Sequence, residues 1–159
     1  MNAIDLIIFN LEEVRRRSIK VWQAIPDEML HWKPDEKAFT CAEMIRHLVQ
    51  AEFLYHHVLL NRGGAALANL HNPFESKPFI SVNNELEFSQ PYHEKFLEYV
   101  KTIPINDLGH VQIDLYDLGG FIRPLGDMLL RIAYHESVHT GQLLDYMRTT
   151  GIDRPKIWD

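Results

Sequence analysis

Apolar residues recur at three- and four-residue steps in several long segments of the chain. The first segment runs from Ile4 to Ile25, and the second runs from Thr40 to the glycine pair Gly63-Gly64. This spacing places the apolar side chains on one face of a helix, so each segment predicts an amphipathic α-helix. The second helix begins at Thr40-Cys41-Ala42-Glu43, which fits a capping box in which the threonine and glutamate side chains bond first-turn amides.

The second half of the chain predicts two more helices. The third covers about Asn84 to Ile103, where Pro91 must either kink the helix or mark its start. The fourth follows Pro124, which suits a first helical turn, and its apolar stripe ends at Thr150-Gly151. Each helix thus has one face that must be buried against its neighbours.

The connections between these helices differ in length. Residues 63–84 form a long connection rich in Gly, Asn and Pro, with a short helical turn expected around residues 65–70. Residues 111–115 alternate apolar and polar side chains, which predicts a short extended piece before the turn at Gly119-Gly120. Four amphipathic helices without substantial strands indicate an all-α four-helix bundle, and we expect a single domain over residues 1–159.

Composition and charge exclude some classes of binding partner. The 159 residues are 46% apolar and 24% charged, with a net charge of -6, so a nucleic-acid backbone would be repelled. The one cysteine, Cys41, permits no internal disulfide, which is consistent with a reducing cytoplasm. No window approaches the roughly 20 apolar residues that cross a bilayer. We therefore expect a cytoplasmic protein with no nucleic-acid or membrane partner.

The chain has nine histidines, and three of them occupy positions suited to metal binding. His135 and His139 are four residues apart, so they lie about 40° from each other on one helix face. His47 lies on the apolar stripe of the second helix, which faces the same bundle interior. Three neutral imidazoles suit zinc, nickel, copper or iron(II), and they leave a coordination position open. Histidines on apolar stripes are more commonly hydrogen-bonded core residues, so a purely structural role stays open.

The positions of the other six histidines do not indicate a metal or binding site. They fall in loops or on polar helix faces, and we expect them at the surface: His31, His56, His57, His71, His93 and His110.

The segment His135-Glu136-Ser137-Val138-His139 also reads as H-E-x-x-H, the zinc metalloprotease pattern with glutamate as general base. Its context disfavours this interpretation. The metzincin extension requires glycine and histidine where the chain has Gln142 and Asp145. Glu136 is also the last glutamate, so no later one can complete the ligands. A zinc hydrolase is therefore the least favoured alternative.

Three segments together resemble the DinB/YfiT-like superfamily of metal-binding four-helix bundles. They are Leu30-His31-Trp32-Lys33-Pro34, Arg46-His47-Leu48-Val49-Gln50-Ala51-Glu52 and the stretch His135 to Leu143. The resemblance covers nearly the whole chain and places the family's three metal ligands on His47, His135 and His139. It implies an up-up-down-down helix order with a long crossover between helices 2 and 3, and frequent homodimers.

The resemblance also implies a class of chemistry. Members with known activity are mostly thiol-dependent transferases or isomerases that use low-molecular-weight thiols such as bacillithiol or mycothiol. We therefore expect a divalent metal ion, zinc or nickel, with a thiol cosubstrate and a small electrophile as substrate. The alternative is a non-catalytic metal-binding or structural dimer of the same fold. An open cavity with polar or charged anchors beside the metal would favour the transferase, whereas closed coordination would favour the alternative.

Overall fold

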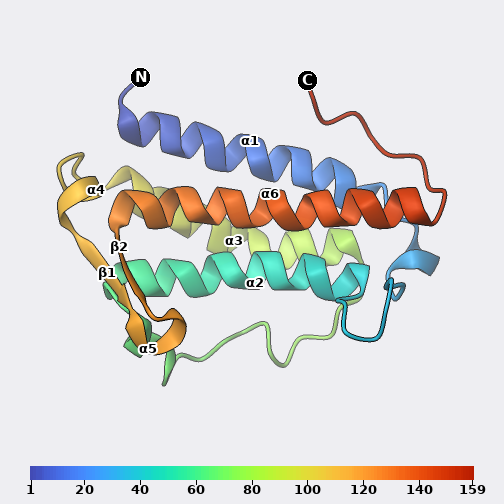
Figure 1. Ribbon diagram of the computed structural model, residues 1–159, viewed down its shortest axis with the longest axis horizontal. Helices are drawn as coiled ribbons and strands as arrows, with labels where there is room; N and C mark the ends of the chain where they lie inside the picture. Colours follow the sequence, from blue (N-terminus) through green and yellow to red (C-terminus); the bar gives the residue numbers. More distant parts are fainter.

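Four long helices make up most of the computed structural model, which describes residues 1–159 (Figure 1). They are α1 (Ala3–Gln23), α2 (Cys41–Leu60), α3 (Val82–Lys101) and α6 (Leu125–Thr149). Shorter elements connect them: the 3-10 turns η1 (Asp27–Met29) and η2 (Gly64–Leu67), the helical turns α4 (Asp107–His110) and α5 (Tyr116–Gly119), and the strands β1 (Gln112–Leu115) and β2 (Phe121–Pro124). None of the helices is long and apolar enough to span a membrane. The predicted four-helix bundle is confirmed.

The four helices form a ring in which α1 packs on α3 and α6, and α2 packs on the same two helices. Figure 1 shows α1 and α6 running in one direction and α2 and α3 in the opposite direction. The expected up-up-down-down order is therefore wrong, and the order is up-down-down-up. The reason lies in the connections. Residues 24–40 turn back at one end of the bundle, whereas residues 61–81 cross its full length, as the long crossover predicted (Figure 1).

Side-chain caps set where the helices begin. Thr40 Oγ1 accepts from the Glu43 amide and the Glu43 carboxylate accepts from the Thr40 amide, so the predicted capping box is confirmed. Helix α3 begins two residues before the predicted start because Ser81 Oγ caps it, accepting from the Asn84 amide. Pro91 lies inside α3 and is exposed, so it does not mark the start of the helix.

A β-hairpin covers one end of the bundle. The predicted extended piece forms β1, which pairs antiparallel with β2, a strand that the sequence did not predict. The turn ends at Gly120, whose φ of 71° lies in the left-handed region that glycine adopts without strain. The Asp114 amide donates to the Arg62 carbonyl, which joins the hairpin to the start of the crossover. Helix α6 follows directly after Pro124.

The core is divided into two apolar clusters by a buried polar layer. Each long helix contributes a charged or titratable residue to the layer between the clusters: Arg15, Glu52, His93 and Glu136. The Arg15 guanidinium donates to both Glu136 oxygens and lies 3.3 Å from Glu52 Oε2. The His93 Nδ1 atom lies 3.0 Å from the Glu52 carboxylate. All four helices are thus joined through a buried polar network, in which Arg15 compensates the charge of Glu52 and Glu136 and His93 lies against Glu52.

Candidate metal centre

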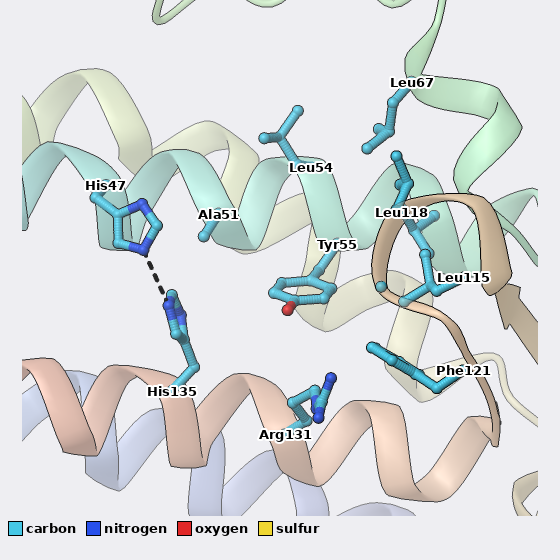
Figure 2. Close-up of a pocket in the computed structure, with 12 residues that line it drawn as sticks. His47, Ala51, Leu54, Tyr55, Leu67, Leu115, Leu118, Phe121, Arg131 and His135 are labelled. Carbon is cyan, nitrogen blue, oxygen red and sulfur yellow. Dashed lines mark hydrogen bonds between the residues drawn. The ribbon is translucent and has the colours of Figure 1, made fainter.

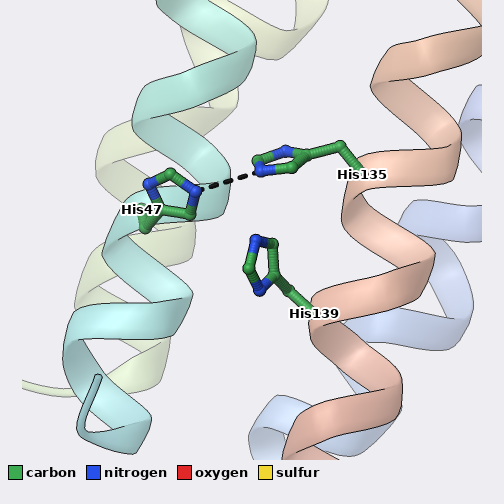
Figure 3. Close-up of side chains that lie close together, drawn as sticks. All are labelled: His47, His135 and His139. Carbon is green, nitrogen blue, oxygen red and sulfur yellow. Dashed lines mark hydrogen bonds between the residues drawn. The ribbon is translucent and has the colours of Figure 1, made fainter. Parts of the chain in front are cut away.

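Helices α2 and α6 bring the three predicted histidines together. Figure 3 shows His47 on α2 facing His135 and His139, which lie one turn apart on α6. The Nε2 atoms of His47 and His135 are 3.0 Å apart, and the candidate ligand atoms of all three rings lie within 4.8 Å of one another. Nitrogens bound to tetrahedral zinc at about 2.1 Å would be roughly 3.4 Å apart. The three imidazoles therefore fit one divalent metal ion.

The surroundings of His47 and His135 favour the neutral form of these two imidazoles. Burial lowers the pKa of His47, and the neighbouring His139 adds to the effect. Burial also lowers the pKa of His135 to about 4, with further contributions from His47, His139 and Arg131. A neutral imidazole has a free nitrogen lone pair, which is the form that binds a metal ion. Burial therefore favours the metal-binding form of His47 and His135.

A fourth side chain orients one of the three ligands. The Nδ1–H group of His139 donates to Gln142 Oε1 at 2.7 Å, which leaves Nε2 of the same ring free as a ligand atom. Gln142 was not among the predicted site residues, although it lies in the stretch His135 to Leu143 that carries the family resemblance. Its position three residues after His139, on the same helix face, is the signal that would have identified it.

A cavity of about 320 Å³ opens beside the histidines (Figure 2). His47 and His135 form one end, and the hairpin and the crossover supply most of the opposite wall. The lining residues are His47, Ala51, Leu54, Tyr55, Val58, Leu67, Leu115, Leu118, Gly119, Phe121, Arg131 and His135. Its walls are mostly apolar, with a few polar groups, as in sites that bind small organic molecules.

Glu136 is occupied elsewhere and does not join the three histidines. Its carboxylate oxygens accept from the Arg15 Nε and Nη2 groups at 2.9–3.1 Å, in the buried interface between α1 and α6. The reason is helical geometry, because the residue after His135 points about 100° away around the helix axis. The zinc hydrolase interpretation is therefore wrong, since the carboxylate that would act as general base is bound to an arginine.

Two of the other histidines contradict the expected surface placement. His93 is buried and lies against Glu52 in the polar layer. His56 is half-buried against Phe96 and Tyr99, and burial lowers its pKa to about 4. Both lie where α2 and α3 pack together, and a histidine at such a contact adds nothing to the apolar pattern of the sequence.

Three of the other four histidines lie at the surface, as expected. His31, His71 and His110 are exposed, whereas His57 is half-buried against Phe53. Cys41 is buried, and burial raises the pKa of its thiol to about 11, which does not suit a nucleophile.

Comparison with known proteins identifies the family. The DinB superfamily profile matches residues 10–143. The fold is similar to the crystal structure of YjoA, a DinB-like protein from Bacillus subtilis, with a TM-score of 0.72, 19% sequence identity and 96% of each chain covered. The comparison with curated proteins gave no match. The family profile, the shared fold and the three gathered histidines agree, and this chain belongs to the DinB superfamily.

Proposed function

We propose that the chain binds one divalent metal ion, zinc or nickel, through His47, His135 and His139, and transfers a low-molecular-weight thiol to a small electrophile. The observation that carries the proposal is the cavity of about 320 Å³ that ends at His47 and His135. A structural metal site is closed by protein ligands, whereas a catalytic site keeps a position open toward its substrate. No fourth His, Cys, Asp or Glu joins the three histidines.

The side chains around the site have separate roles in this proposal. The three imidazoles hold the ion, and Gln142 fixes the orientation of the His139 ring. The apolar cavity walls bind the body of the electrophile and exclude water from the reacting atoms. When bound, the metal ion lowers the pKa of a coordinated thiol, so that the thiolate nucleophile forms near neutral pH. The chain's own thiol does not serve as this nucleophile, because Cys41 is buried.

Cobalt substitution tests the metal and the thiol in one experiment. Protein purified without a metal-affinity tag is loaded with Co²⁺ and titrated with N-acetylcysteine, with N-acetylserine as the matched control. We expect one Co²⁺ per chain and a thiolate-to-cobalt charge-transfer band with the thiol only. His135→Ala should lose the ion, because two imidazoles remain. A chain that binds no ion after reconstitution, or an ion that does not respond to the thiol, would instead support the structural alternative.

Turnover is tested with 1-chloro-2,4-dinitrobenzene. In this reaction a carbon–sulfur bond forms, chloride leaves with the electron pair of the carbon–chlorine bond, and the thiol proton passes to solvent. We expect product formation above the uncatalysed rate only in metal-loaded protein. The homodimer that the family resemblance implies is part of the same proposal, and sedimentation of the metal-loaded protein tests it.

A further inference from the structure

The cavity lies between two stripes of side chains at the same helical spacing. On α6, His139, His135 and Arg131 follow one another at four-residue steps, so Arg131 lies about 6 Å along the axis from His135. On α2, Ala51 lies between His47 and Tyr55 at the same spacing, and its small side chain leaves room between the two rings (Figure 2). The metal site is therefore continuous with the space in front of Arg131.

The polar groups of the cavity gather at its histidine side. Figure 2 shows the Tyr55 hydroxyl pointing toward the space between His135 and Arg131. Leucine side chains and Phe121 form the wall farther from the histidines, contributed by η2, α5 and the hairpin. A ligand that fills this space must have an apolar part against the leucines and a polar part near Arg131 and Tyr55.

Arg131 is the one partly buried arginine without a carboxylate partner in the chain. Arg15, Arg16, Arg17 and Arg46 all pair with glutamates, and the exposed Arg123 and Arg148 lie near aspartates of their own neighbourhood. Arg131 instead stacks on Phe121, with its guanidinium carbon 4.5 Å from the ring centroid. Stacking uses the flat face of the guanidinium and leaves the N–H groups in its plane free to donate.

We infer that Arg131 is the anion-binding residue of the cavity, and that it binds the carboxylate of a small organic acid whose apolar body contacts Phe121 and the leucines. The guanidinium provides the paired donors that match a carboxylate, and the Tyr55 hydroxyl provides a neighbouring donor. The inference rests on the proposed function, because it takes the cavity as the substrate-binding part of the metal site. It adds the charge and shape of a molecule that the cavity binds.

The local charge of the cavity supports this assignment, although the net charge of the protein does not. The chain carries a net charge of -6, so an anion gains no general attraction and must be held by a local cation. Arg131 lies in the cavity wall with no acidic residue among the lining side chains. An anion in the cavity therefore meets one positive group without a competing carboxylate.

Binding of phenylacetate tests the inference, with phenylacetamide as the neutral ligand of the same shape. Calorimetric titration is carried out first on metal-free protein, because a carboxylate can also bind a metal ion directly. We expect phenylacetate to bind more tightly than the amide, and Arg131→Gln to weaken phenylacetate binding by about tenfold to a hundredfold. The same substitution should leave binding of the amide nearly unchanged. Arg123→Gln is the matched control, because Arg123 is exposed and does not line the cavity.

The outcomes separate this inference from the proposed function. Equal affinity for the acid and the amide, no binding of either ligand, or full affinity in Arg131→Gln would each overturn the assignment of Arg131. Carboxylate binding that requires the metal ion and ignores Arg131 would also overturn it, by placing the anion on the ion. If the protein bound phenylacetate through Arg131 but did not catalyse thiol transfer, the transferase proposal would be overturned. The assignment of the anion site would not be affected.

Discussion

At the scale of single residues, the hydrogen bond from His139 to Gln142 sets which nitrogen of the ring can bind a metal ion. The 2.7 Å contact holds the proton on Nδ1 and leaves Nε2 free. We expect Gln142→Ala to weaken zinc binding by about tenfold, at the lower end of the range for outer-shell partners. Competition with a chromogenic chelator measures this change.

Gln142→Glu provides the matched control for that prediction. The carboxylate keeps an acceptor at the same position, so zinc affinity should equal or exceed that of the parent protein. Gln142 is exposed, so neither substitution should alter folding. Equal zinc affinity in the alanine variant would show that the ring is held in place by packing alone.

The three histidines of the site could be predicted from the sequence, whereas Arg131 could not. His47, His135 and His139 were predicted because helical spacing alone places them on faces that meet. Arg131 lies on that same face one turn earlier, but its role depends on a cavity that is closed by the hairpin and the crossover. Contacts between distant segments of this kind leave no periodic signal in the sequence.

At the scale of elements, Arg15 connects α1 to α2 and α6 through two buried carboxylates. Its loss would leave Glu52 with only His93 and Glu136 without a charged partner. We expect Arg15→Met to lower the free energy of unfolding by about 3–5 kcal/mol, the usual cost of removing one partner from a buried ion pair. Urea denaturation measures the loss.

Two variants decide whether charge is the cause of that loss. Adding Glu136→Leu to Arg15→Met removes the stranded carboxylate and should recover part of the stability. Arg148→Met breaks only an exposed pair with Asp145 and should cost less than about 1 kcal/mol. If the double variant were no more stable than Arg15→Met, lost packing would be the better explanation.

The contact between α2 and α3 makes stability depend on pH through His56. Its pKa falls from 6.5 to about 4 on folding, so the unfolded chain binds more protons between these values. The contribution of His56 therefore lowers stability as the pH falls from about 7 toward 4. His57 and Glu52 act on this ring from α2, while Lys95 and Tyr99 lie near it on α3.

His56→Leu should make the loss of stability between pH 8 and pH 5 smaller than in the parent protein. Urea denaturation at each pH measures it. The comparison at pH 8 isolates packing, because the imidazole is neutral there in both folded and unfolded chains. Identical losses in the two proteins over this pH range would show that His56 titrates alike in both states.

The boundaries of these elements show where sequence patterns stop being informative. The start of α2 was predicted correctly because Thr40 and Glu43 form a local cap. The strand Phe121–Pro124 was missed because it is too short for an alternating pattern and depends on pairing with β1. His93 was misplaced for a similar reason, since its burial depends on Glu52 of another helix.

At the scale of the whole molecule, the two features that the family resemblance implied do not agree with each other. A long crossover between helices 2 and 3 does not fit an up-up-down-down order. A long crossover after α2 forces α2 and α3 to run in the same direction, because the chain must return to the end where α2 began. Helices α1 and α2 run in opposite directions because residues 24–40 turn back at one end of the bundle. The connections formed by residues 24–40, 61–81 and 102–124 are similar in length, so loop length alone does not give the up-down-down-up order from the sequence.

Metal binding should stabilise the whole bundle, because its ligands come from helices far apart in the sequence. His47 lies on α2 and the other two ligands lie on α6, so only the folded chain presents all three together. Zinc at 100 times its Kd should then add about 2.7 kcal/mol of stability. For a chain of this length, that gain raises Tm by roughly 5–11 °C.

Thermal unfolding with and without zinc measures this gain, and His139→Ala is the variant that should abolish most of it. Its ring is only half-buried, so the substitution should change the metal-free Tm little while removing one of three ligands. Exposed His71→Ala is the matched control and should keep the full zinc response. If His139→Ala retained that response, the stabilising ion would be bound elsewhere, and the three histidines would be a hydrogen-bonded part of the bundle instead of its metal site.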